Sequence, residues 1–133
     1  MVNVMFIRFV SGEIDEDSHV PAGIFCAAWD LIGERRRIDG EHYVLKELLD
    51  WFNEHLKSPS DYRLKTAWLM ERAICWFKPT AHEHLSRAWE MAGILERNGV
   101  PIYMVKAKEA GYILYEDEAQ VFAIPFAQTR RAL

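Results

Sequence analysis

The dipeptide Asn98-Gly99, followed closely by Pro101, divides the chain into a helical part and a β-rich part. Asparagine and glycine tolerate the left-handed backbone that ends a helix, and proline prevents the helix from resuming. Before this break, hydrophobic residues recur every three or four positions, which is typical of helices. After it, short apolar runs alternate with turn residues, which is typical of strands. The break therefore predicts a protein that combines helices with a sheet.

One strand and four helices are predicted before the break. The first ten residues are rich in β-branched and aromatic side chains, so a central strand is expected there. Helices are expected over about 20–33, 41–56, 61–77 and 80–98. The third is apolar on two sides, which indicates a helix that is deeply buried or shared with a partner. Thr80 and Glu83 have the spacing of a capping box at the start of the fourth.

Three strands are predicted after the break, over 102–106, 112–115 and 119–124. Short turns separate them, so they are expected to form an antiparallel meander. The order of elements, β-α-α-α-α-β-β-β, predicts an α+β fold with a small antiparallel sheet and helices packed on one face. The length of 133 residues indicates a single domain over 1–133, with a frayed tail from about residue 129.

Composition narrows the classes of function. The formal net charge of −4 argues against nucleic-acid binding, since such proteins carry a concentrated basic face. The apolar start is interrupted by Arg8, and it is too short to span a membrane. Cys26 and Cys75 have no metal-binding spacing and are expected as free thiols, which fits a reducing compartment. We therefore expect a cytoplasmic protein that binds neither nucleic acid nor a membrane.

The segment 76–84 combines aromatic rings, a lysine, a chain break and two histidines. Free N–H groups at the start of the fourth predicted helix would favour an anion, with the lysine beside it and a ring as an apolar wall. The two histidines are two positions apart, so a helix directs them to nearly opposite sides and a shared metal is not expected. The segment also suits an ordinary helix–helix corner. The candidate ligand-binding residues are Trp76, Lys78, His82, His84 and Tyr115.

Two acidic segments are expected to share one edge of the sheet. If the first strand pairs antiparallel with its neighbour in the meander, it points the same way as 112–115, and the loops that follow both strands meet. Such a rim suits a divalent cation or a basic partner, although two solvated turns are a simpler interpretation. A parallel first strand would separate the two loops. The candidate residues are Glu13, Asp15, Glu16, Asp17, Glu116, Asp117 and Glu118.

The five tryptophans all fall in predicted helices. Trp68 and Trp89 lie on the inner apolar stripes and are expected in the core. Trp29 and Trp51 lie off the main stripes, and exposed tryptophans are enriched at interfaces, so these two indicate a protein partner or self-association as a dimer. Alternatively, the third predicted helix covers them.

No local catalytic motif occurs in the sequence, neither a nucleophile elbow nor a phosphate-binding glycine loop. We therefore assign no catalytic residue, no cofactor and no metal ligand. The expected function is a small non-catalytic interaction or accessory module that uses exposed aromatics and the acidic rim. The alternative is a small protein that binds an anion, or a small enzyme, with its site at 76–84.

Three short motifs carry a resemblance to other proteins: Trp51-Phe52-Asn53, Trp76-Phe77-Lys78 and the run from Gly111 to Glu118. Through them, the segment 50–126 resembles an uncharacterised group of small bacterial proteins. The resemblance implies a bacterial source and a stand-alone protein. It implies no activity, cofactor or partner.

Overall fold

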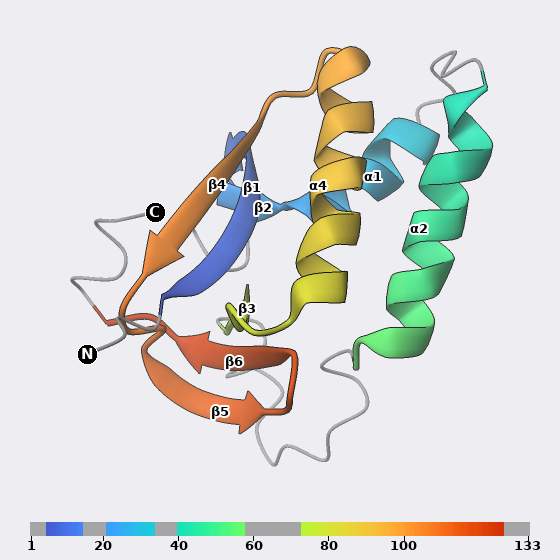
Figure 1. Cartoon of the computed structure of the whole chain (residues 1–133). Helices are drawn as coiled ribbons and strands as arrows, with labels where there is room; N and C mark the ends of the chain where they lie inside the picture. Colours follow the sequence, from blue (N-terminus) through green and yellow to red (C-terminus); the bar gives the residue numbers. More distant parts are fainter. Residues whose placement is uncertain (1–4, 15–20, 34–39, 58–72, 127–133) are drawn as a thin grey trace.

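The chain folds into a curled antiparallel sheet with helices gathered on one side of it (Figure 1). The computed structural model describes residues 5–14, 21–33, 40–57 and 73–126. The elements are β1 (Phe6–Ile14), β2 (Pro21–Gly23), α1 (Ile24–Gly33), α2 (Glu41–His55), β3 (Ile74–Phe77), α4 (His82–Arg97), β4 (Ile102–Ala107), β5 (Tyr112–Glu116) and β6 (Gln120–Ile124). The α+β class and the antiparallel sheet are confirmed, whereas the predicted order of elements with four successive helices is wrong.

Strand β1 lies at the centre of the sheet. Along one edge it pairs with β4, from Phe6 opposite Ala107 to Ser11 opposite Ile102. Its other edge is shared by β2 near its end and by β3 near its start. The short β2 explains why α1 begins at Ile24, later than predicted. Strand β3 then pairs with β6, and β6 with β5.

The predicted meander is wrong, because β3 lies between β1 and the last two strands. Within the described part of the chain, β4 pairs only with β1, and β5 pairs only with β6. Each antiparallel pairing reverses the strand direction, and β3 adds one such pairing between β1 and β6. Strand β1 therefore runs parallel to β6 and antiparallel to β5, whereas the sequence predicted that β1 and the strand at 112–115 point the same way.

This topology separates the two acidic segments. The turn after β5 is next to Gln120, which pairs with Phe77, and Phe77 pairs with Ile7 near the start of β1. Glu13 lies six residues further along β1, which is roughly 20 Å in an extended strand. The arrangement on which the shared acidic rim was predicted is therefore wrong. Asp15, Glu16 and Asp17 lie outside the described residues.

Residues 74–77 form a strand, where the end of a third helix was predicted. The rest of that prediction, over 61–72, lies outside the described residues. Ile74 and Trp76 enter one apolar cluster, whereas Phe77 enters another on the opposite face of the sheet. The part of the two-sided apolar pattern that falls on 74–77 thus belongs to a strand that is covered on both faces.

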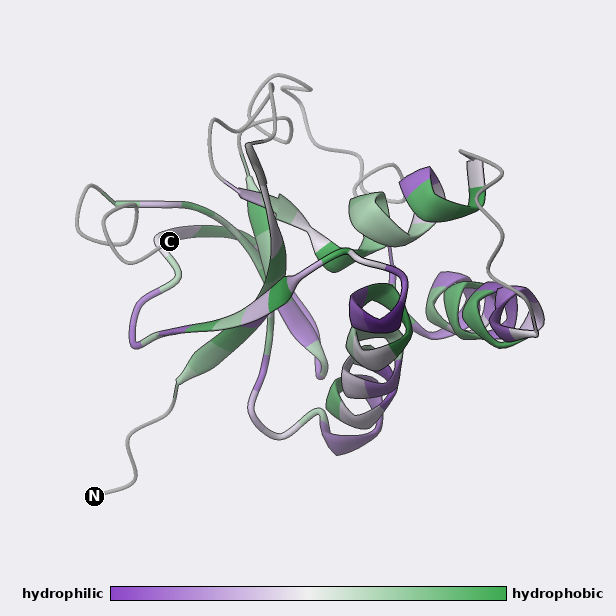
Figure 2. Cartoon of the chain, turned by 90° about the horizontal axis from the view of Figure 1, so that it is seen from above, coloured by the Kyte–Doolittle hydropathy of each residue, from purple (hydrophilic) through white to green (hydrophobic). Residues whose placement is uncertain are grey.

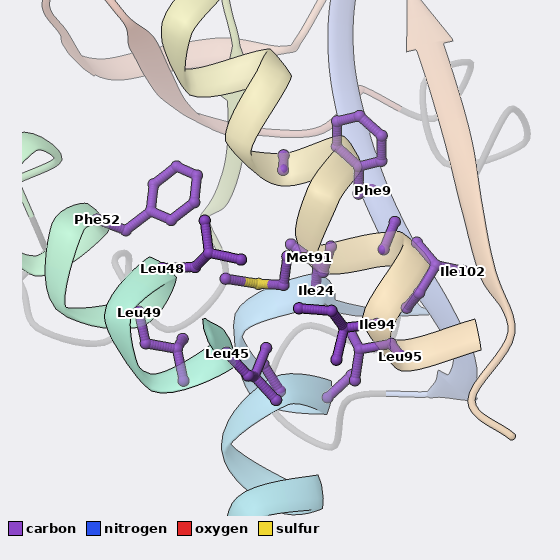
Figure 3. Close-up of a cluster of buried hydrophobic side chains, with 14 of the residues drawn as sticks. Phe9, Ile24, Leu45, Leu48, Leu49, Phe52, Met91, Ile94, Leu95 and Ile102 are labelled. Atoms are coloured by element: carbon purple, nitrogen blue, oxygen red, sulfur yellow. The ribbon is translucent and has the colours of Figure 1, made fainter. Parts of the chain in front are cut away.

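The larger cluster lies between the helices and the sheet (Figure 3). Side chains of α2 point towards Met91 and Leu95 of α4, with Ile24 of α1 and Phe9 of β1 beside them. Figure 2 shows that the helices carry hydrophobic and hydrophilic residues alternately along their length, as amphipathic helices do. The predicted stripe of α2 is confirmed by its buried residues, Leu45, Leu48, Leu49 and Phe52.

A second, smaller cluster fills the inside of the curled sheet. Its largest member is Trp76, which is 0% exposed. The other buried members are small or β-branched, which leaves room for the indole ring: Ile74, Ala107, Ala110, Val121 and Ala123. The sheet is thus supported from both of its faces.

Candidate functional site

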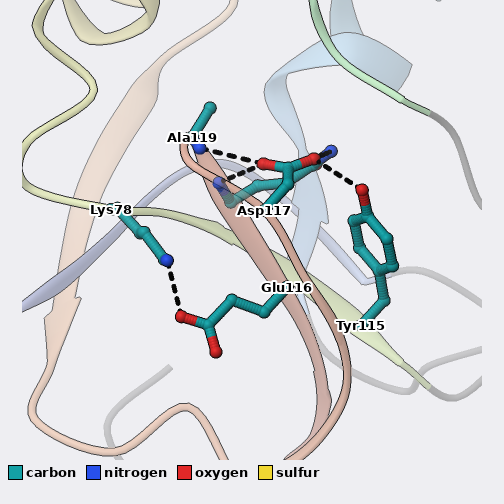
Figure 4. Close-up of polar contacts among 6 residues, drawn as sticks. Lys78, Tyr115, Glu116, Asp117 and Ala119 are labelled. Atoms are coloured by element: carbon teal, nitrogen blue, oxygen red, sulfur yellow. Dashed lines mark hydrogen bonds and ion pairs between the residues drawn. The ribbon is translucent and has the colours of Figure 1, made fainter.

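The predicted site at 76–84 is dispersed in the structure. Trp76 is enclosed by the sheet, so its ring cannot form the wall of a surface site. Lys78 follows β3 and its Nζ lies 2.5 Å from Oε2 of Glu116, at the end of β5 (Figure 4). This ion pair joins two predicted site residues, one from the helix corner and one from the acidic turn.

The start of α4 differs from the predicted capping box. The N-cap is Ala81, and no side chain caps this end of the helix. The main-chain carbonyl of Thr80 accepts a hydrogen bond from the amide of His82, which is exposed at the first position of α4. The capping box of Thr80 and Glu83 is therefore wrong.

His84 points towards the end of α2 and not towards Lys78. Its Nε2 lies 2.9 Å from the carbonyl oxygen of His55. Trp51 lies between these helices. Its ring stacks on the His55 ring with 4.3 Å between centroids and lies edge-on to the His84 ring at 4.8 Å. The Arg87 guanidinium lies over the same indole ring, 4.2 Å from its centroid. Trp51 is therefore half-buried by side chains of α2 and α4. Trp29 remains 42% exposed, with Lys46 Nζ 5.2 Å from its ring centre.

Asp117 organises the turn between β5 and β6 (Figure 4). Its Oδ1 accepts hydrogen bonds from the amides of Ala119 at 2.9 Å and Gln120 at 3.0 Å. Its Oδ2 accepts from the hydroxyl of Tyr115 at 3.0 Å and from Nε2 of Gln120 at 3.1 Å. Burial alone would raise the pKa of Asp117, but these four hydrogen bonds outweigh it and hold the pKa below its usual range.

The stability of this turn is expected to depend on pH. Because the pKa of Asp117 is lower in the folded protein than the usual value of about 3.9, its contribution is complete above that value and is lost as pH falls through the folded pKa. We expect the free energy of unfolding of wild type to fall with acid more steeply than that of Asp117→Asn. Urea unfolding between pH 7 and pH 2.5 measures this. Glu118→Gln removes a charge from the same turn but none of the four hydrogen bonds, so it should keep the wild-type steepness; equal slopes for all three proteins would contradict the assignment.

Two of the three predicted acidic residues of this turn thus have structural partners. Glu116 pairs with Lys78, Asp117 caps the turn, and Glu118 is exposed. No group of three or more histidine, cysteine, aspartate or glutamate residues with the geometry of a metal site occurs in the part of the chain that the structure describes.

An exposed aromatic surface that the sequence did not predict lies beside β4. Trp89 is 54% exposed on α4, and its ring lies edge-on to that of Phe9 with 4.9 Å between centroids. Phe9 pairs directly with Met104 of β4, which is 39% exposed. On the other face of β4, Tyr103 is 58% exposed. We call Trp89, Tyr103 and Met104, together with the edge of β4 that is unpaired among the described residues, the β4 surface.

The prediction that Trp89 lies in the core is wrong. The buried residues of α4 include Met91 and Ile94, which the predicted stripe omitted. When Met91 and Ile94 are included in the apolar stripe of α4, the centre of the stripe lies away from Trp89. Trp89 is roughly 120° round the helix axis from the buried Leu95. Met91 and Ile94 were the signal in the sequence that could have placed Trp89 correctly.

No helix in the described ranges is long and apolar enough to cross a membrane. In the comparisons with known proteins, the chain matches no protein-family model, no curated protein and no solved structure. The resemblance of 50–126 to small bacterial proteins therefore stays a prediction.

Proposed function

We propose that the protein is a non-catalytic interaction module, and that its partner at the β4 surface is a second copy of the same chain. The observation that carries the proposal is the edge of a six-residue strand that no described residue pairs with, with exposed Trp89 and Met104 on one face and Tyr103 on the other. An open strand edge presents free N–H and C=O groups to another strand. Tryptophan and methionine are enriched at protein interfaces.

The charges of β4 are compatible with self-pairing. Lys106 is the only charged residue of the strand. In a two-fold antiparallel pairing, side chains that lie opposite each other are on the same face of the sheet, so the pairing is centred on a residue and not between two residues. A pairing centred on Val105 places Lys106 opposite Met104 of the second copy. The two lysines are therefore not directly opposite each other, and each lysine stem packs on a methionine side chain.

A charge exchange at Met104 tests this pairing. Met104→Lys places a like charge opposite Lys106 twice in each dimer, at about 0.2–1 kcal/mol per pair, and loses the contact of the methionine with the lysine stem as well. We expect it to weaken the dimer about tenfold or more, whereas Met104→Glu creates two opposite-charge pairs and should preserve it. Sedimentation equilibrium on each protein gives the dissociation constants.

Val44→Lys is the matched control, because Val44 is a 38% exposed apolar residue on α2, away from β4, and Met104 is 39% exposed. It should dimerise like wild type. A wild-type protein that stays monomeric at several hundred micromolar would refute the proposal. Equal dimerisation of Met104→Lys and Met104→Glu would show that the copies meet through another surface.

A further inference from the structure

A pocket of about 240 Å³ lies where α1, the end of α2, β3 and β6 meet. Four of its ten lining residues are aromatic: Phe25, Trp29, Phe52 and Phe122. Phe25 and Phe52 meet edge-on with 4.8 Å between ring centroids, and the 42% exposed Trp29 connects the lining with the surface. Concave, mostly apolar pockets with few polar groups are the usual form of small-molecule sites.

Gln120 supplies a fixed polar group to this lining. It is 0% exposed, and its Nε2 donates to the carbonyl of Lys57 at 3.0 Å and to Asp117 Oδ2 at 3.1 Å. Both N–H groups are therefore in use. Its Oε1 accepts one hydrogen bond, from Cys75 Sγ at 3.1 Å, and a carbonyl oxygen can accept two. The amide thus has capacity for a ligand that donates one hydrogen bond.

Cys75 also lines the pocket, but its thiol is unreactive at neutral pH. Burial raises its pKa to about 12, which outweighs the opposing influence of the Arg8 charge. A protonated thiol is a poor nucleophile and a weak hydrogen-bond donor. Cys75 therefore acts in the lining as a hydrogen-bond donor to Gln120 and not as a nucleophile, and the pocket is suited to reversible binding.

From these features we propose that the pocket binds a small, uncharged aromatic molecule with a single N–H or O–H donor. Among the residues that line it, only Lys57 carries a charge, and that side chain is exposed at the mouth. Aromatic walls favour an aromatic ligand through offset and edge-on contacts. A cavity of about 150 Å³ accommodates benzene, so this larger pocket suits a bicyclic ring the size of indole.

Two small-molecule probes test whether the ligand's N–H donor matters, and two variants test whether it binds in this pocket. Calorimetric titration with indole should give saturable binding of one molecule per chain. The same titration with 1-methylindole, which lacks the N–H, should give a dissociation constant about fivefold higher or more, as expected for one lost hydrogen bond.

Asn53 is exposed at the rim of the pocket, whereas its neighbour Glu54 does not line it. Asn53→Trp should fill the mouth and weaken indole binding at least tenfold, and Glu54→Trp should leave binding unchanged. Both positions are exposed on α2, so circular dichroism should confirm that both variants fold. The proposal is overturned if indole does not bind up to millimolar concentration, if 1-methylindole binds as tightly, or if Asn53→Trp binds like Glu54→Trp.

Discussion

Replacing Gly111 with alanine is expected to lower the free energy of unfolding by several kcal/mol, or to prevent folding. Gly111 precedes β5 with φ at 124°, a backbone conformation that side chains other than glycine rarely adopt. A Cβ atom there would lie 2.0 Å from the carbonyl oxygen of Ile124 and 2.8 Å from Cα of Pro125. Both contacts are with backbone at the end of β6, so relief requires the β5–β6 pair to shift.

Gly99→Ala provides the matched control. Gly99 also has a positive φ, 82°, but a Cβ atom there meets nothing within 4 Å. Gly99→Ala should therefore lower the free energy of unfolding only through backbone strain, by on the order of 1 kcal/mol. Urea unfolding monitored by circular dichroism gives both values. If the two variants are equally stable, the close approach of Gly111 to β6 is not a constraint on the fold.

Replacing Trp76 with alanine is expected to have the second large effect, lowering the free energy of unfolding by about 3–5 kcal/mol. The indole ring is fully buried inside the curled sheet, and its removal leaves a cavity between β3, β6 and β4. Trp76→Phe keeps an aromatic ring in place and should cost less. Equilibrium unfolding in guanidinium chloride measures the loss.

Trp89→Ala separates the effect of burial from the effect of losing a tryptophan. Trp89 is more than half exposed and stands on the β4 surface, so its loss should cost less than about 1 kcal/mol in the monomer. If Trp76→Ala were no more destabilising than Trp89→Ala, the inner cluster would not be a core.

Most of the local structure could be predicted from the sequence. The stripe of α2 is regular because Leu45, Leu48, Leu49 and Phe52 recur at helical spacing, and its predicted limits of 41–56 match Glu41–His55. The last three strands are also found where β-branched residues and turn signals place them, because both depend on neighbours in the chain.

The pairing of the strands could not be predicted from any local pattern in the sequence. The segment Ile74–Phe77 is apolar at every position, and such a run suits a buried helix as well as a strand that is covered on both faces. Its pairing with β1 and β6 is decided by residues far away in sequence. That single misassigned strand changed the predicted direction of β5 relative to β1, and with it the predicted acidic rim.

The candidate sites depended on the same tertiary information. Trp76 was expected as an apolar wall beside Lys78 at the corner between two predicted helices, whereas β3 buries its ring inside the sheet. The pocket beside Gln120 draws its lining from α1, α2, β3 and β6, and no short motif spans these elements.

The central position of β1 affects how the polypeptide folds during its synthesis. Its long edge pairs with β4, which is translated nearly a hundred residues later, and β3 pairs with β6 close to the end of the printed sequence. An emerging chain on the ribosome must therefore carry the apolar strand β1 without its main partner until β4 has been translated. Contacts this distant in sequence form slowly, and the exposed strand is a natural substrate for chaperones until β4 emerges.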